Sequence, residues 1–258
     1  MLEVSGISKS FGGLQAVSEA SLKVSEGSIV SLIGPNGAGK TTLFAIISGF
    51  LKADSGTVNL YGDALGGLKP FQVCQMGMVR TFQITQPFAK LSILENIMIG
   101  AYARIQNPED AAQEAYKVAE HVGIRVPLES SAADLNVAGR KRLELARALA
   151  TQPKILLLDE VMAGLNPTEV EEILKVIREI RNSGITIFLI EHVMQAVMSL
   201  SDYTYVLNNG CLIASGTPKQ VAADPQVIEA YLGQGASKLN QNPATVSYTH
   251  LTLPTTSF

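Results

Sequence analysis

Apolar positions along the chain form continuous runs in some segments and alternate with polar positions in others. Residues 28–33, 155–158 and 185–190 are nearly continuous apolar runs of strand length, which predicts buried strands. Residues 1–25 alternate apolar and polar side chains, which predicts short antiparallel strands, and residues 56–62 predict a further strand between turns. The chain is therefore expected to combine a buried sheet with an antiparallel sheet formed near its start.

The middle of the chain has a helical pattern. Helical spacing is clear over residues 109–122, within a block of about 92–149 that separates the strand signals on either side. Another helix is expected from Asn166, which can cap it, with Pro167 in the first turn and Glu169 at the capping-box position. The pattern predicts an α/β core into which an α-helical subdomain is inserted.

A phosphate-binding motif follows the first buried strand. Residues 34–41 read G-P-N-G-A-G-K-T and match G-x-x-x-x-G-K-[ST]. Glycines let backbone N–H groups turn toward phosphate oxygens, Lys40 can reach the outer phosphates, and the Thr41 hydroxyl can hold Mg²⁺. The helical spacing of residues 43–50 places the motif at a helix N-terminus, where anions bind. The predicted nucleotide-binding positions are Gly34, Pro35, Asn36, Gly37, Ala38, Gly39, Lys40, Thr41 and Thr42.

Acidic and imidazole side chains follow the other two apolar runs. Asp159 and Glu160 end the second run, and His192 lies just after the third. Because ligands bind at the carboxyl ends of strands in open parallel sheets, we expect these side chains to surround the phosphates beside Lys40. Asp159 then holds Mg²⁺, Glu160 acts as general base toward the attacking water, and His192 contacts the γ-phosphate or orients water. An acidic pair that ends a strand in solvent and a structural histidine are the alternatives.

Two further positions carry weaker signals. Gln83 ends an alternating segment and can complete the Mg²⁺ shell. Phe11 can stack on adenine, although a core aromatic of the first sheet explains it nearly as well. The expected catalytic set is Lys40, Gln83, Glu160 and His192, and the expected metal set is Thr41, Gln83 and Asp159.

Length and composition limit the remaining classes of function. The 258 residues suit one domain with an inserted subdomain, and a net charge of −3 gives no support to a nucleic-acid partner. Cys74 and Cys211 form no metal or redox pattern, which predicts reduced core thiols. No leader and no apolar run of membrane-spanning length is evident, so a cytoplasmic protein is expected. Residues 1–233 form the expected domain, whereas residues 234–258 are expected to have little order and to be a non-native tail.

Over residues 2–233 the order of motifs resembles that of the ATP-binding-cassette ATPases. An early aromatic, the phosphate loop, a glutamine after a strand, a signature before an Ala/Leu/Arg-rich helix, an apolar run ending in Asp-Glu and a strand-end histidine follow the family's order. The resemblance implies a RecA-like phosphate-loop NTPase core with an N-terminal antiparallel β subdomain and an inserted helical subdomain. It also implies ATP and Mg²⁺ as ligands and a dimer with a second cassette, in which each ATP lies between one subunit's phosphate loop and the other's signature.

The signature departs from the family's usual Leu-Ser-Gly-Gly-Gln. Residues 135–139 read Leu-Asn-Val-Ala-Gly, so Asn136, Ala138 and Gly139 are the positions expected at the partner's ATP. The Asn136 amide can donate to phosphate, or the side chain can simply cap the following helix. Basic residues at 140–142 crowd the start of this helix against its dipole, which favours either a nearby anion or acidic partner, or a solvated basic face.

Three stretches narrow the resemblance further. Residues 138–147, 160–169 and 208–233 are similar to the ATP-binding subunits of branched-chain amino-acid importers. This implies an ATPase that drives import through membrane permease subunits and lies at the inner face of the cell membrane, with permease contacts between residues 83 and 149. The alternatives are a cassette for another cargo, such as lipid export, and a non-transport ATPase switch, which the absence of a heptad run disfavours. A small-molecule kinase fits the signature and strand-end histidine poorly.

Overall fold

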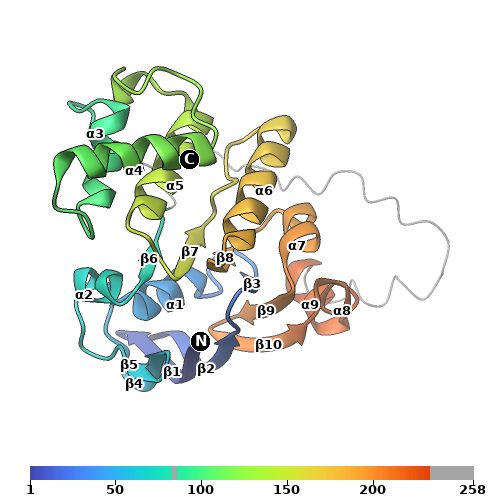
Figure 1. Cartoon of the computed structure of the whole chain (residues 1–258). Helices are drawn as coiled ribbons and strands as arrows, with labels where there is room; N and C mark the ends of the chain where they lie inside the picture. The colour runs from blue at the N-terminus through green and yellow to red at the C-terminus, as the bar shows by residue number, and fades with distance from the viewer. Residues whose placement is uncertain (83–85, 233–258) are drawn as a thin grey trace.

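The computed structural model describes residues 1–82 and 86–232 of the chain. Two sheets and a group of helices build the fold (Figure 1). The antiparallel sheet has the order β2-β1-β4-β5 and contains β1 (Leu2–Phe11), β2 (Leu14–Val24), β4 (Ser55–Leu60) and β5 (Asp63–Ala64). The alternating start of the chain therefore does form antiparallel strands, but β1 and β2 are 10 and 11 residues long rather than short.

The second sheet has the order β10-β9-β3-β8-β7-β6 and holds the three apolar runs at its centre. Its strands are β3 (Ile29–Ile33), β6 (Met78–Arg80), β7 (Ile155–Asp159), β8 (Thr186–Ile190), β9 (Tyr203–Asn208) and β10 (Cys211–Gly216). Neighbouring strands from β9 to β6 are parallel, and β10 pairs antiparallel with β9. Because β3, β8 and β7 are adjacent and parallel, their carboxyl ends lie at one edge of the sheet.

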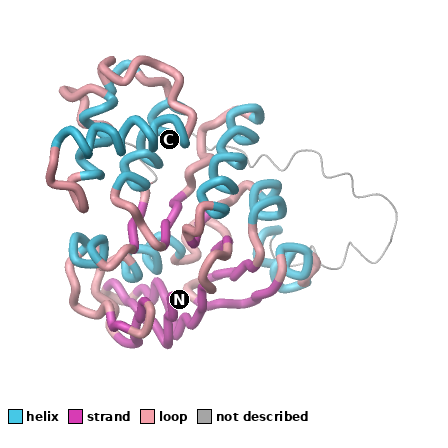
Figure 2. The backbone as a smooth tube through the Cα atoms, viewed as in Figure 1, coloured by secondary structure: helices cyan, strands magenta, loops and turns pink. Residues whose placement is uncertain are grey.

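Helices alternate with the strands of the second sheet or fill the connection between β6 and β7. The helices are α1 (Lys40–Ile47), α2 (Pro70–Gln75), α3 (Ile93–Ala101), α4 (Pro108–His121), the 3₁₀ turn η1 (Ala132–Asp134), α5 (Val137–Ala150), α6 (Pro167–Asn182), α7 (Met194–Leu200), α8 (Pro218–Ala222) and α9 (Pro225–Leu232). Helices α3–α5 form a group at one side of the molecule, and Figure 2 shows that this group contains helices and loops. Gly100 lets α3 approach α5, because a Cβ there would collide with the Arg147 carbonyl oxygen. No helix of the described chain is long and apolar enough to cross a bilayer.

The central strands are buried on both faces. Leu156 and Leu158 of β7 pack into a core shared with α3–α6, whereas Ile155 and Leu157 face a core shared with α1 and the antiparallel sheet. Successive side chains of this fully buried strand therefore point alternately into the two cores on either side of the sheet. This α/β architecture, with an N-terminal antiparallel sheet and a helical group, confirms the expected fold class.

Other expectations are met or corrected at single residues. Asn166 accepts from the Glu169 N–H at 3.0 Å and the Glu169 carboxylate accepts from the Asn166 N–H at 2.9 Å, which confirms the capping box of α6. Cys211 is exposed and Cys74 is partly buried, so the prediction of core thiols is wrong for Cys211. It lies at the start of an edge strand, where one face meets solvent. The expected boundaries of the helical subdomain stay predictions.

Candidate nucleotide-binding site

The phosphate loop connects the end of β3 to the start of α1 and lies tightly against its neighbours. Gly34 and Gly39 have φ angles of 151° and 103°. A Cβ at Gly34 would collide with the Leu207 carbonyl oxygen, and one at Gly39 with the Ala16 carbonyl oxygen. These contacts with both sheets fix the loop, because only glycine fits such close backbone approaches.

Lys40 folds back over the loop that precedes it. Its Nζ donates to the carbonyl oxygens of Gly34 at 2.7 Å and Pro35 at 3.0 Å. Burial lowers the pKa of Lys40, while the charges of Glu160 and Asp159 act to raise it. The lysine therefore lies near both carboxylates that end the β7 run. An anion within the loop would offer this ammonium a stronger, charge-assisted hydrogen bond than a carbonyl does.

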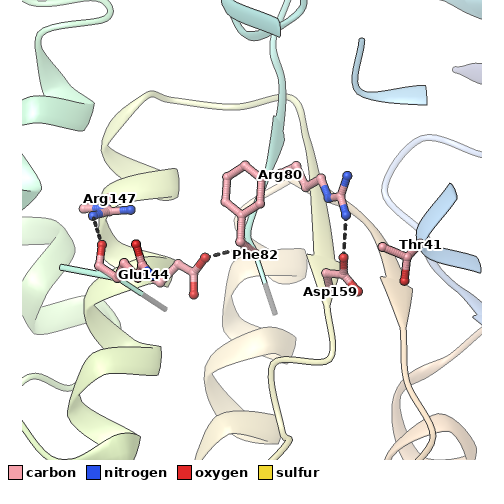
Figure 3. Close-up of a pocket in the computed structure, with 7 residues that line it drawn as sticks. Thr41, Arg80, Phe82, Glu144, Arg147 and Asp159 are labelled. Atoms are coloured by element: carbon pink, nitrogen blue, oxygen red, sulfur yellow. Dashed lines mark hydrogen bonds and ion pairs between the residues drawn. The ribbon is translucent and has the colours of Figure 1, made fainter. Parts of the chain in front are cut away.

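Asp159 is buried at the end of β7 and paired with an arginine that the sequence patterns had not singled out. The Arg80 Nη2 lies 2.6 Å from the Asp159 Oδ2, and the side chains are 7% and 2% exposed (Figure 3). The guanidinium lies 5.9 Å and 5.5 Å from the ring centroids of Phe44 and Phe82. The available signal was the position of Arg80 in the alternating segment 79–83, but a buried partner is not visible in such a pattern.

A hollow of about 440 Å³ opens beside this ion pair. Its walls come from α1, from β6 and the segment after it, and from α5 and β7: Thr41, Arg80, Phe82, Gln86, Glu144, Arg147 and Asp159. Glu144 accepts from the Phe82 N–H (Figure 3). Arg147 donates to the Gln86 carbonyl oxygen at 3.2 Å. Helix α5 thus holds the chain on both sides of residues 83–85. Gln83 itself lies outside the described residues, so its expected role stays a prediction.

Glu160 has a backbone conformation that side-chain-bearing residues rarely adopt. Its φ is 49°, in the left-handed region. Its N–H donates to the Ile190 carbonyl oxygen at 3.0 Å, which ties the end of β7 to the end of β8. The His192 Nδ1 lies 3.9 Å from the Glu160 Oε1, and the imidazole is half exposed. The structure therefore places Glu160 and His192 side by side at the carboxyl edge, as expected.

The residue before His192 is a buried carboxylate that had been given no role. Glu191 is 0% exposed, and its Oε1 accepts from the Met162 N–H at 3.1 Å. Burial raises the pKa of Glu191 to about 7, although the Met162 N–H, the His192 N–H and the Lys141 charge act in the opposite direction. The signal in the sequence was an acidic residue at the end of an apolar run, which by itself does not distinguish a buried carboxylate from an exposed one.

The signature segment forms the start of α5. The Asn136 side-chain oxygen accepts from the Gly139 N–H at 2.8 Å, so Asn136 does cap the helix. Val137 is 54% exposed, and Ala138 and Gly139 are partly buried. The capping bond occupies the oxygen of the amide, and a hydrogen bond from its nitrogen to phosphate stays a prediction.

The basic residues of α5 do not form a solvated face. Arg140 donates to the Ala133 carbonyl at 3.1 Å, and Lys141 donates to the Glu160 carbonyl at 3.2 Å. Arg142 donates to the Val122 carbonyl at 2.5 Å and forms an ion pair with Glu172. Of the alternatives left open for these residues, the structure therefore supplies an acidic partner, Glu172, together with backbone carbonyl oxygens. They come from outside α5, which is why the helical pattern did not show them.

Two aromatic residues lie outside the lining of the hollow: Phe11, which was expected to stack on adenine, and Tyr231, which had been given no role. Phe11 is 49% exposed at the end of β1, which contradicts the alternative of a core aromatic; stacking on adenine stays a prediction. The Lys9 Nζ lies 5.6 Å from the centroid of its ring. Burial raises the pKa of Tyr231 of α9 to about 12, while the backbone of Gly34 acts to lower it. This effect of the phosphate loop on the last described helix was not foreseen.

The oxygen donors at this edge suit a magnesium ion. Thr41 supplies a hydroxyl and Asp159 a carboxylate at the wall of one hollow, and both are the hard donors that Mg²⁺ prefers. Among residues 1–82 and 86–232 there is no group of three His, Cys, Asp or Glu side chains placed for a metal. The donor set therefore fits an ion that takes one or two protein ligands and completes its shell with phosphate and water.

Comparison with known proteins agrees with this geometry. The family described as "ABC transporter" matches residues 17–163, and the family described as "Branched-chain amino acid ATP-binding cassette transporter" matches residues 211–237. The chain is similar to the high-affinity branched-chain amino acid transport ATP-binding proteins LivG of Salmonella typhimurium, at 41% identity over 91% of this chain and 98% of the relative, and BraF of Pseudomonas aeruginosa, at 39% over the same shares.

Solved structures give the same assignment. A nucleotide-free ATP-binding cassette from an ABC transporter superposes with a TM-score of 0.83 at 33% identity, over 91% of this chain and 99% of that one. A cassette in its ADP conformation superposes with a TM-score of 0.82 at 34% identity over the same shares. The sequence motifs, the parallel strand ends and these similarities lead to one conclusion: the chain belongs to the ABC transporter family and is one of its ATP-binding cassette ATPases.

Proposed function

We propose that this chain is the ATP-hydrolysing subunit of an importer for branched-chain amino acids. The observation that carries the catalytic part is the convergence of Lys40, Glu160 and Asp159 at the carboxyl edge of the central sheet. The cargo is inferred from the names of relatives that the chain matches over nearly their whole length, and from the second family match at residues 211–237.

In this proposal the phosphate loop holds ATP with its backbone N–H groups from Gly34 to Thr42 and with the Lys40 ammonium. Thr41, Asp159 and Gln83 hold Mg²⁺, which when bound supplies positive charge to the phosphate oxygens. Phe11 lies at the end of β1, where an exposed ring can receive the adenine.

Hydrolysis needs a base for the attacking water and stabilisation of the charge on the phosphoryl group. Glu160 is assigned as the base, because its carboxylate lies beside His192 at the strand edge and near the Lys40 charge. His192 orients the water or contacts the γ-phosphate. Lys40 stabilises the charge that develops on the phosphate oxygens, and its hydrogen bonds to the loop carbonyl oxygens support this role.

A second cassette completes the site in this proposal. The helix start formed by Asn136, Ala138 and Gly139 exposes Val137 and offers backbone N–H groups at a helix N-terminus, where phosphate binds. In a head-to-tail pair it would meet the partner's ATP. Membrane permease subunits hold the pair at the inner face of the cell membrane and contact the segment between residues 83 and 149.

The catalytic assignment is tested with Glu160→Gln in the full chain. This variant keeps the size of the side chain but removes the base, so steady-state hydrolysis should fall to background while ATP binding is retained. Phosphate release and binding of a fluorescent ATP analogue measure the two properties. Substantial turnover in the variant would overturn the role of Glu160.

The cargo is tested by co-purification with the permease subunits encoded beside this chain, followed by reconstitution in vesicles. Leucine, isoleucine or valine, presented with a binding protein, should stimulate ATP hydrolysis and accumulate inside the vesicles. Stimulation by a lipid instead would favour an exporter, and ATPase activity unaffected by any permease would favour a non-transport switch.

A further inference from the structure

A buried lysine and a buried glutamate contact the backbone of the loop that carries Glu160. Lys141 is 5% exposed, and its Nζ donates to the Glu160 carbonyl oxygen at 3.2 Å. Glu191 is 0% exposed, and its carboxylate accepts from the Met162 N–H at 3.1 Å. Residues 160–162 are therefore held by α5 and by the residue that follows β8.

The charges of these two side chains act on each other. The Lys141 charge lowers the pKa of Glu191 and so opposes the effect of burial on this carboxyl. The second carboxylate oxygen of Glu191 has no hydrogen-bond partner among the described residues. Burying a lysine and a carboxylate is costly, and the cost is offset only where the two charges and their hydrogen bonds compensate each other. A lysine exposed to solvent at this helix start would avoid that cost. A contribution to folding stability therefore does not explain why Lys141 is buried beside Glu191.

The loop between them needs external support. Glu160 has a φ of 49°, a conformation that costs energy for a residue with a Cβ and persists only where surrounding contacts determine it. Its N–H is fixed by the Ile190 carbonyl oxygen. Lys141 fixes its carbonyl oxygen and Glu191 fixes the N–H two residues later, so both flanks of the strained residue are held.

We infer that Lys141 and Glu191 are positioning residues for hydrolysis, which together hold residues 160–162 so that the Glu160 carboxylate is directed toward the attacking water. This inference rests on the proposed role of Glu160. Neither side chain needs to touch ATP. Both act through the backbone of the base, and displacement of a catalytic group by about 1 Å can cost about 10²-fold in rate.

The first test compares kcat with KM in the full chain. Lys141→Met removes the donor and keeps the apolar stem, and we expect kcat to fall by about tenfold or more while KM for ATP changes by less than about twofold. Lys141→Arg restores a cationic donor and should recover part of the lost kcat. Lys175→Met and Glu179→Gln, on the exposed face of α6, are the matched controls and should leave both constants unchanged.

The second test asks whether the two residues act together. Glu191→Leu, which removes the acceptor for the Met162 N–H, should also lower kcat, and the Lys141→Met/Glu191→Leu double variant should lose less than the product of the single losses. Hydrogen exchange of the amides at 160–164 should be faster in both single variants than in the controls, a readout that does not depend on turnover.

Equal kcat in Lys141→Met and wild type, with unchanged amide exchange at 160–164, would overturn the inference. So would a rise in KM with kcat preserved, because that result would place Lys141 in nucleotide binding. Failure of the proposed function is recognised separately, since Glu160→Gln would then retain turnover whatever the Lys141 variants do.

Discussion

The two proposed halves of the nucleotide site are built by different means. The phosphate-loop half stands on three buried, parallel strands, and its loop is packed against the backbone of Leu207 and Ala16. The signature half is the first turn of α5, with Val137 exposed and Asn136 as its cap. The comparison indicates that tertiary packing determines the first half, whereas the second depends on one helix end and its cap.

The largest effect is expected from a substitution in the phosphate-loop half. Lys40→Met removes the ammonium that lies over the loop and near both carboxylates, so kcat/KM should fall by about 10²–10³-fold, with a parallel loss of ATP affinity. Steady-state kinetics and equilibrium binding measure the change. The exposed Lys175→Met is the control, and an Lys40 variant that binds and hydrolyses ATP like wild type would contradict the assignment of this half.

The next prediction compares the Arg80–Asp159 ion pair of the phosphate-loop half with the Arg142–Glu172 ion pair of the signature half. Arg80→Met leaves Asp159 buried without its partner, which should lower the free energy of unfolding by about 3–5 kcal/mol. Glu172→Met breaks the Arg142–Glu172 pair from its exposed side, where Glu172 is 42% exposed, and should cost about 1 kcal/mol. Urea unfolding of the nucleotide-free chain measures both. Equal losses would show that burial does not distinguish the two pairs.

Stability measurements over a pH series test the buried carboxyl that follows β8 in the phosphate-loop half. The pKa of Glu191 is raised from 4.5 to about 7 in the folded chain. The contribution of the protonated carboxyl to the free energy of unfolding is therefore fully present below about pH 4.5 and is lost as the pH rises through about 7. Relative to wild type, Glu191→Gln should therefore gain up to about 3 kcal/mol of unfolding free energy between those limits.

The groups that share this environment are Glu160, Lys141 and the His192 backbone. Urea unfolding at several pH values measures the difference, with Glu179→Gln as the exposed control. If the difference in unfolding free energy between Glu191→Gln and wild type did not vary with pH, the raised pKa of the buried Glu191 carboxyl would be contradicted.

The smallest change separates capping from nucleotide recognition in the signature half. Asn136 and Asn107 cap α5 and α4 by accepting hydrogen bonds from backbone N–H groups of the first turn, one for Asn136 and two for Asn107, so Asn136→Ala and Asn107→Ala should each lower the unfolding free energy by about 1 kcal/mol. Only Asn136→Ala should also lower ATP turnover. Equal turnover in the two variants would leave Asn136 with a capping role alone.

The features that could be predicted were those carried by local order in the chain. Contiguous patterns carry the phosphate loop, the apolar runs of β3, β7 and β8 and the capping box of α6. Parallel pairing then brings the carboxyl ends of the three strands together. This is why Glu160 and His192 were expected at one edge of the sheet, and the structure places them 3.9 Å apart there. The fold class followed from the same patterns.

The features that could not be predicted are buried polar contacts between distant segments. Arg80 and Asp159 are 79 residues apart in the sequence, and the pKa of Tyr231 in the last described helix responds to the backbone of Gly34 in the phosphate loop. Lys141 was part of a basic cluster that periodicity could not distinguish from a solvated face. Whether a charged side chain is buried depends on its tertiary partner, and no pattern within one helix contains that information.

The left-handed backbone of Glu160 has a consequence for selection experiments. Glycine adopts a φ of 49° without the cost that a Cβ imposes, and asparagine tolerates it better than most residues. A library randomised at this position and screened only for thermal tolerance should enrich glycine and asparagine. The same library screened for growth that depends on transport should keep glutamate, so the two screens would show at one codon that stability and catalysis favour different residues.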